Sequence, residues 1–154
     1  MLANRNVLSV ISFLLRISVA LTFVIAGTLK ILDPTKFAEQ TSNYQFFVEY
    51  SNYVGAFLPP IEIIASIALV FSKGHWRTAS FVVLFGLLGV FTTAILRAWA
   101  LGINLECGCF GEGSTTIGVW PVLRNLTLMT ALALSVFLDF RGLQRLPATT
   151  PSLP

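Results

Sequence analysis

The sequence predicts an all-α membrane protein, a four-transmembrane-helix bundle with a short interfacial helix between its first two spans. Three observations predict it: 55% of the 154 residues are hydrophobic, only 11% are charged, and the apolar residues gather in four long stretches. A soluble domain carries about 25% charged residues, so this chain lacks the polar side chains that a water-exposed surface requires. Its charge of +3 is not gathered into a basic patch, so we expect no nucleic-acid partner.

Four stretches are long enough to cross a lipid bilayer, which takes about 20 mostly apolar residues in a helix. We expect spans at about residues 7–32, 54–71, 78–101 and 120–140. The first exceeds the apolar core of a signal peptide, so we expect it to stay as a span. Together the spans would form a single membrane domain over residues 1–145, followed by a disordered Pro/Thr/Ser-rich tail at 146–154.

The ends of the spans carry the residues expected there. Trp76, Trp99 and Trp120 all fall at span ends, where interfacial aromatic side chains gather. Pro59 and Pro60 fall in the first turns of the second span, where a helix tolerates proline best.

A polar-aromatic stretch, residues 33–53, separates the first two spans. Asp33 followed by Pro34 is typical of a helix N-cap and first helical position. An apolar face would comprise Phe37, Tyr44, Phe47 and Val48. We therefore expect a short helix on the membrane surface, with an irregular loop as the alternative.

The distribution of lysine and arginine between the short loops predicts the orientation. One side carries Arg5, Lys73, Arg77, Arg141 and Arg145, and the other carries Lys30 and Lys36. This count favours both termini in the cytoplasm of a bacterium, with the chain a multi-pass protein of the cytoplasmic (inner) membrane. The loops at 33–53 and 102–119 would then face outward.

The only two cysteines, Cys107 and Cys109, lie one residue apart in the outward loop before the fourth span. An oxidising compartment favours redox chemistry for such a pair. A disulfide between them would close a very small, strained ring, which makes it labile and suited to exchange. It would add little stability, because that gain grows with loop length.

Two other interpretations of the cysteines remain open. In the first, the two cysteines are a structural pair or have no function. A metal site is weaker, because two sulfurs are half of a structural zinc site and the one histidine, His75, lies on the opposite side. We therefore expect no metal.

Four ionisable side chains fall within spans, where charge is rare and marks a functional candidate: Arg16, Glu62, Arg97 and Arg124. Glu62 is the expected partner of Arg16, or else of Arg97 or Arg124. The last two arginines have an alternative as snorkelling interfacial residues. If they lie near the cysteines, they would stabilise a thiolate there. All four would form a polar interior beneath the loop.

A set of residues across positions 16–125 resembles one family. The set comprises Arg16, Ala26-Gly27-x-x-Lys30, Asp33-Pro34-x-x-Phe37, Leu58-Pro59, Glu62, Cys107-Gly-Cys-Phe-Gly111 and Trp120-x-x-x-Arg124-Asn125. It resembles the DoxX-like superfamily and, within it, the methylamine-utilisation protein MauE group. That resemblance implies a four-helix bundle of the inner membrane, associated with disulfide formation or maturation of periplasmic proteins and often with thioredoxin-like partners.

The leading hypothesis is a membrane thiol–disulfide redox protein whose catalytic residues are Cys107 and Cys109, with Cys109, nearer to Arg124, favoured as the attacking thiol. Its partner would be a periplasmic thioredoxin-like protein or a disulfide-containing client, since this chain contains nothing like a thioredoxin domain. A membrane quinone is the candidate electron acceptor by analogy with other four-helix oxidases, and no cofactor is certain. The alternatives are a non-catalytic scaffold for a separate redox partner and, last, a small transporter.

Overall fold

The computed structural model describes residues 2–43, 51–102 and 118–144, and every regular element among them is a helix. The elements are α1 (Leu2–Leu32), α2 (Pro34–Asn43), α3 (Ser51–Phe71), α4 (His75–Ala100) and α5 (Val119–Gln144). Four of them are long and apolar enough to cross a membrane, over Asn6–Leu32, Tyr53–Phe71, His75–Ala100 and Val119–Asp139. The expected all-α, four-span fold is therefore confirmed, with each helix start within a few residues of its expected position.

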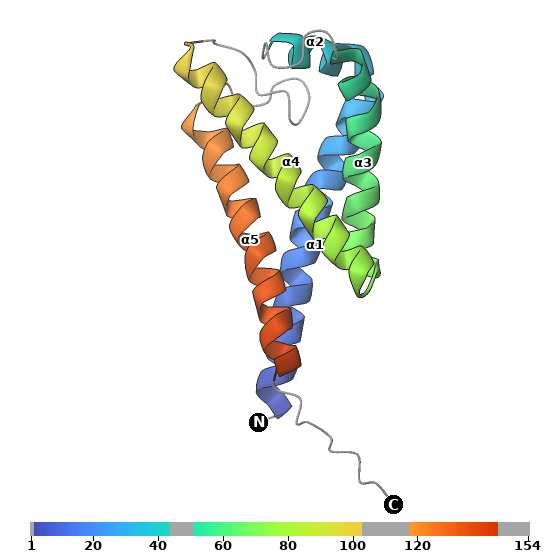
Figure 1. Cartoon of the computed structure of the whole chain (residues 1–154), viewed down its shortest axis with the longest axis vertical. Helices are drawn as coiled ribbons and strands as arrows, with labels where there is room; N and C mark the ends of the chain where they lie inside the picture. Colours follow the sequence, from blue (N-terminus) through green and yellow to red (C-terminus); the bar gives the residue numbers. More distant parts are fainter. Residues whose placement is uncertain (1, 44–50, 103–117, 145–154) are drawn as a thin grey trace, which may run out of the picture.

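The four long helices form a ring in which each packs against two others. Helix α1 packs against α3 on one side and α5 on the other, and α4 packs against both α3 and α5. Figure 1 shows the short α2 lying across one end of the bundle, close to the start of α3. At this same end α4 finishes and α5 begins, whereas α1 begins and α5 finishes at the opposite end. The chain segment between α4 and α5 is therefore attached at the α2 end.

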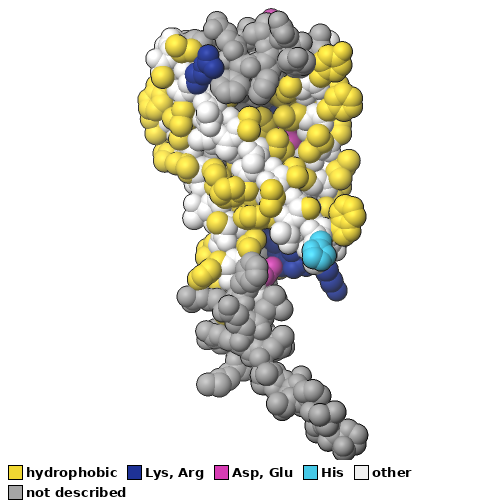
Figure 2. Space-filling model, in the orientation of Figure 1, with side chains coloured by type: hydrophobic (Ala, Val, Ile, Leu, Met, Phe, Trp, Pro, Cys, Tyr) yellow, Lys and Arg dark blue, Asp and Glu magenta, His cyan; other side chains and the backbone are white. Residues whose placement is uncertain are grey.

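Large aliphatic side chains fill the interior between the four helices. Val19 of α1, Leu84 of α4 and Leu132 of α5 are fully buried, and Leu69 and Leu88 nearly so. Many other large apolar side chains instead face outward and form the broad hydrophobic belt of Figure 2. In lipid such a surface needs no protein cover, because the bilayer interior is itself apolar.

Close approach between helices depends on small residues. A Cβ on Gly27 of α1 would lie 2.9 Å from Cγ1 of Ile63 and 3.2 Å from the Pro59 carbonyl oxygen. A Cβ on Gly55 would lie 3.2 Å from that of Ala38 in α2. These glycines let α1 and α2 pack directly on the backbone of α3.

The two prolines of α3 correct one expectation. Because α3 begins at Ser51, before the expected start of the second span, Pro59 and Pro60 lie inside the helix and not in its first turns. Proline has no backbone N–H, so each one removes the helical hydrogen bond to the carbonyl four residues earlier. Pro59 is fully buried among neighbouring helices, the setting in which membrane helices tolerate proline.

The predicted cap and interfacial residues occupy the expected places. Asp33 Oδ1 accepts a hydrogen bond from the Lys36 backbone N–H at 3.2 Å and from the Thr35 hydroxyl at 3.0 Å, so it caps α2. Trp76 and Trp120, both 75% exposed, lie in the first turns of α4 and α5. The expected apolar face of the short helix is described only at Phe37, since positions 44–50 lie outside the described residues.

Candidate functional site

The cysteine pair that the sequence singles out, Cys107 and Cys109, lies outside the described residues. What the structure does describe is the protein interior near the point of attachment of that segment. There α1, α3, α4 and α5 surround a buried polar site, which we call the outer site and define as Lys30, Glu62, Arg124 and Asn125. The name follows the expected orientation of the chain.

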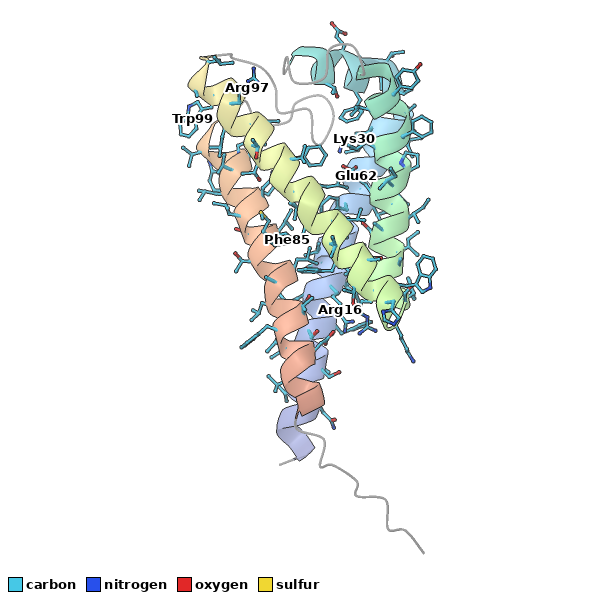
Figure 3. The ribbon with its side chains drawn as sticks, viewed as in Figure 1. Arg16, Lys30, Glu62, Phe85, Arg97 and Trp99 are labelled. Atoms are coloured by element: carbon cyan, nitrogen blue, oxygen red, sulfur yellow. The ribbon has the colours of Figure 1, made fainter. Side chains whose placement is uncertain are left out.

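The outer site is built around one ion pair. Lys30 Nζ donates to both carboxylate oxygens of Glu62, at 2.7 Å to Oε1 and 2.9 Å to Oε2. Lys30 is 4% exposed and Glu62 is fully buried, so both charges are withdrawn from bulk water. Figure 3 shows the two side chains meeting between α1 and α3. Isolated charges at this depth would be very costly, and mutual pairing with short hydrogen bonds offsets that cost.

Two aromatic rings complete the surroundings of the ammonium group. The centroid of the Phe37 ring lies 5.0 Å from Lys30 Nζ, and that of Phe91 lies 4.8 Å away. Ring faces attract a cation, most strongly where water is excluded. Phe37 belongs to α2 and Phe91 to α4, so this one lysine holds four helices together: α1, α2, α3 and α4.

A small cavity of about 30 Å³ adjoins the ion pair. Arg124 and Asn125 of α5 line it together with Lys30 and Glu62, and rings and aliphatic side chains form the rest of its wall. A cavity needs about 10–15 Å³ of such space to hold one water molecule, so this one has room for one or two. Asn125 is 3% exposed and donates to the Thr92 hydroxyl at 3.3 Å, which fixes its side chain in place.

The other expected members of the polar interior are separated from this site. Arg97 is exposed near the end of α4, close to Trp99, and does not line the cavity (Figure 3). Arg16 precedes Lys30 by 14 residues on the same helix. At about 1.5 Å of rise per residue this separation amounts to about 21 Å. From the sequence we expected Arg16 to contribute to a polar interior beneath the cysteine segment, and this expectation is wrong.

The expected pairing of Arg16 with Glu62 is wrong. Arg16 instead faces Asp139 of α5, with 3.5 Å between its Nη1 and Oδ2 of Asp139, and its Nε donates to the Ser12 carbonyl. Glu62 pairs with Lys30. Arg16 and Lys30 share one face of α1, but only Lys30 lies at the level of Glu62, and a helical repeat identifies the face without the level.

Lys30 and Asp139 are the ionisable residues that sequence reasoning missed as members of a site. Lys30 was counted among the loop cations of the outward side, and Asp139 lies at the last position of the fourth span. Both occupy the last turns of apolar stretches, and both have a buried counter-ion. A position on the same face of α1 as the buried Arg16 is the signal that would have found Lys30.

The outer site holds two cationic side chains, one carboxylate and one amide in a small, largely apolar space. Such a set can bind or exchange protons with one or two waters, and can orient a polar group of a molecule that approaches it. Among the described positions no cluster of three or more His, Cys, Asp or Glu side chains could hold a metal ion.

Four apolar helices around a buried ion pair define a small multi-pass membrane protein. The family model described as methylamine utilisation protein MauE matches residues 8–138, and the chain belongs to this family. It is 33% identical over 141 residues to the methylamine utilization protein MauE of Paracoccus denitrificans, an alignment that covers 90% of this chain and 71% of that protein. No solved structure matches the chain.

Proposed function

We propose that this protein is a membrane thiol–disulfide redox protein that supports disulfide formation or maturation of extracytoplasmic proteins. Cys107 and Cys109 are its exchanging thiols. The observation that carries the proposal is that their segment is attached at the end of the bundle where the outer site lies. The proposal deepens, for this chain, the broader role in methylamine utilisation that its family indicates.

Chain connectivity keeps the first cysteine near that end. Cys107 follows Gly102 by five residues, so even a fully extended chain places its Cα within about 18 Å of that of Gly102. Gly102 itself has a φ of 67°, a left-handed conformation that suits glycine and turns the chain at the end of α4. We propose that the thiols stay near the cations Lys30 and Arg124 of this bundle end, because such proximity would favour the thiolate form.

The exchange balances in the direction of disulfide formation. A client thiolate attacks one sulfur of the Cys107–Cys109 disulfide, forms a mixed disulfide and releases the other sulfur as a thiolate. The second client thiol then attacks the mixed disulfide, so the client is oxidised and the pair is reduced. Two electrons and two protons must then leave, and a membrane quinone reduced to its quinol is the proposed acceptor. In the reverse direction Cys109 is the proposed attacking thiol.

The proposed orientation places both termini in the cytoplasm of a bacterial inner membrane. Among the described residues, Lys73 and Arg77 lie in or next to the α3–α4 turn, at the end opposite α2. An excess of cations on the cytoplasmic side supports this orientation. The cysteines then face the periplasm, where a thioredoxin-like protein or a disulfide-containing client is the proposed partner. Membership of the wider DoxX-like superfamily stays a prediction.

Trapping of mixed disulfides tests the exchange. Cys107→Ser and Cys109→Ser variants each keep one thiol, which would hold a partner covalently because no second thiol resolves the bond. We expect one variant to yield a reducible adduct, and the double variant, the matched control, to yield none. If neither single variant forms an adduct while the full protein still supports client maturation, the chain acts as a non-catalytic scaffold for a separate redox partner.

A further inference from the structure

The bundle end opposite the outer site contains a charge imbalance. Oδ2 of Asp139 lies 3.5 Å from Nη1 of Arg16 and 3.4 Å from Nη1 of Arg77. Its other oxygen accepts a hydrogen bond from the Ser12 hydroxyl at 2.6 Å. One carboxylate therefore faces two guanidinium groups, and one positive charge remains in excess. We call Arg16, Arg77 and Asp139 the inner cluster.

The excess charge is partly buried. Arg16 is 7% exposed, and its buried Nη1 makes no hydrogen bond to any group that the structure describes. The carboxylate nearest to it is shared with Arg77 and is itself 27% exposed in its side chain. A buried guanidinium with half of a counter-ion is incompletely compensated, so a further anion at this place would stabilise the protein.

The inner cluster lies at one boundary of the hydrocarbon core. Helix α3 has 21 residues, which at about 1.5 Å each gives about 31 Å, close to the thickness of the core. Arg77 Nε donates at 3.0 Å to the carbonyl of Ser72, the first residue after α3. Figure 2 shows basic and acidic side chains and His75 together at the lower edge of the hydrophobic belt. The neighbouring Trp76 is 75% exposed, as expected of an interfacial anchor.

We infer that Arg77, paired with Asp139 and helped by the exposed Lys73 four residues before it, binds the phosphate of an anionic phospholipid. Arg77 is 30% exposed in its side chain, so part of its guanidinium group can meet a ligand while Nη1 and Nε stay anchored to Asp139 and Ser72. Guanidinium groups bind phosphate through paired hydrogen bonds. At the edge of the apolar belt the phosphate is that of a lipid headgroup. A lipid with net negative charge also balances the excess cation, whereas a zwitterionic one does not.

The test compares lipids within each variant of the full-length protein. Melting temperatures are measured in nanodiscs of pure phosphatidylcholine and in nanodiscs that also contain phosphatidylglycerol. We expect phosphatidylglycerol to raise the melting temperature of the unaltered protein, and Arg77→Gln to lose at least half of that rise. Lys36→Gln, which removes an exposed cation at the opposite end, is the matched control and keeps the full rise. Lys73→Gln, which alters an exposed side chain, gives a smaller loss and a second reading if Arg77→Gln folds poorly.

Three results would overturn the inference. The first is an equal phosphatidylglycerol effect in Arg77→Gln and the unaltered protein. The second is the absence of any difference between the two lipids in the unaltered protein. In the third, inorganic phosphate added to phosphatidylcholine nanodiscs reproduces the whole rise, which would make the site one for soluble phosphate and not for a lipid.

Discussion

The two ends of this bundle differ in how their buried charges are paired. At the outer site one lysine meets one carboxylate through two hydrogen bonds of 2.7 and 2.9 Å, and both side chains are almost entirely buried. At the inner cluster two arginines share one carboxylate at 3.4 and 3.5 Å, and two of the three side chains are part-exposed. The Lys30–Glu62 pair is balanced one to one, whereas in the inner cluster two arginines share one carboxylate and one positive charge is left over.

This difference teaches that depth decides how membrane-embedded charges are compensated. Glu62 lies well inside α3, away from bulk water and headgroups, so the protein itself must supply the counter-ion. The inner cluster lies at the end of α3, where headgroups can complete what the protein leaves open. Substitutions at the two ends should therefore differ in size and in their dependence on lipid.

The largest effect is expected from Glu62→Ala. It leaves the Lys30 ammonium buried without its carboxylate, which for a buried pair costs about 3–5 kcal/mol of unfolding free energy. Chemical unfolding in detergent micelles would measure the loss. The double variant Lys30→Met, Glu62→Met should recover most of it, because well-packed apolar side chains often replace a buried pair at no cost. A double variant as unstable as Glu62→Ala would show that the pair is not the cause.

A smaller effect is expected from Asp139→Asn. The two guanidinium groups of the inner cluster would then face each other, but Arg77 can turn toward water because it is already 30% exposed in its side chain. We expect a loss of about 1.5–3 kcal/mol, the range for hydrogen bonds to charged groups. Added salt should reduce the loss, since exposed charges are screened and buried ones are not. An Asp139→Asn loss that equals that of Glu62→Ala would remove the distinction between the two ends.

Gly27→Ala tests the packing that brings Lys30 to Glu62. The new methyl group would meet Ile63 and the Pro59 carbonyl at 2.9 and 3.2 Å, which forces α1 away from α3 and lengthens the ion pair one turn away. A loss of about 1–2 kcal/mol is expected, as for other overpacked sites. Gly86→Ala is the matched control, because nothing lies within 4 Å of its added Cβ. In that control the higher helix propensity of alanine should leave stability unchanged or slightly raised. Equal losses in both variants would show that the helix contact is not the cause.

The smallest effect is a pH dependence of α2. The hydrogen bond from the Lys36 backbone N–H, with that from the Thr35 hydroxyl, holds the pKa of Asp33 below its ordinary value of 3.8. Its stabilisation of α2 is therefore complete above that value and is lost as the pH falls through the lowered pKa. Amide exchange, corrected for its intrinsic pH dependence, should show α2 losing protection in acid before α3 does. A loss of α2 protection in acid that is as large in Asp33→Ala as in the unaltered protein would contradict this.

Much of the fold could be predicted from the sequence because the bilayer sets the length and composition of its spans. The start of α2 was equally accessible, since Asp33-Pro34 is a local signal for a helix cap. The pairing of the buried charges could not be predicted from the sequence. Arg16 and Lys30 lie on the same face of α1, and the choice between them depends on how far α3 is shifted along α1. That shift follows from the close contact at Gly27, which is a property of the packed structure.

The candidate site was predicted in part for the same reason. Glu62 and Arg124 do line one cavity, as two of the four in-span charges that were expected to form a polar interior. Arg97 and Arg16 do not line the cavity. Arg97 lies exposed near the end of α4, and Arg16 precedes Lys30 by 14 residues on α1. Phe37 and Phe91 were not foreseen as partners of Lys30, since a ring that contacts a cation has the same sequence pattern as any core aromatic residue.

The central claim is that the outer end contains a dithiol that cycles in an oxidising compartment. Labelling of intact spheroplasts with a membrane-impermeant maleimide tests it directly, because Cys107 and Cys109 are the only cysteines of the chain. We predict that Cys107 and Cys109 take no label in untreated spheroplasts, because they form a disulfide. After treatment of the spheroplasts with a membrane-impermeant reductant, both should be labelled. Lys73→Cys in a background lacking both native cysteines, the control for the other side, should be labelled only after permeabilisation. Full labelling without any reductant, or labelling of the native pair only after permeabilisation, would contradict the claim.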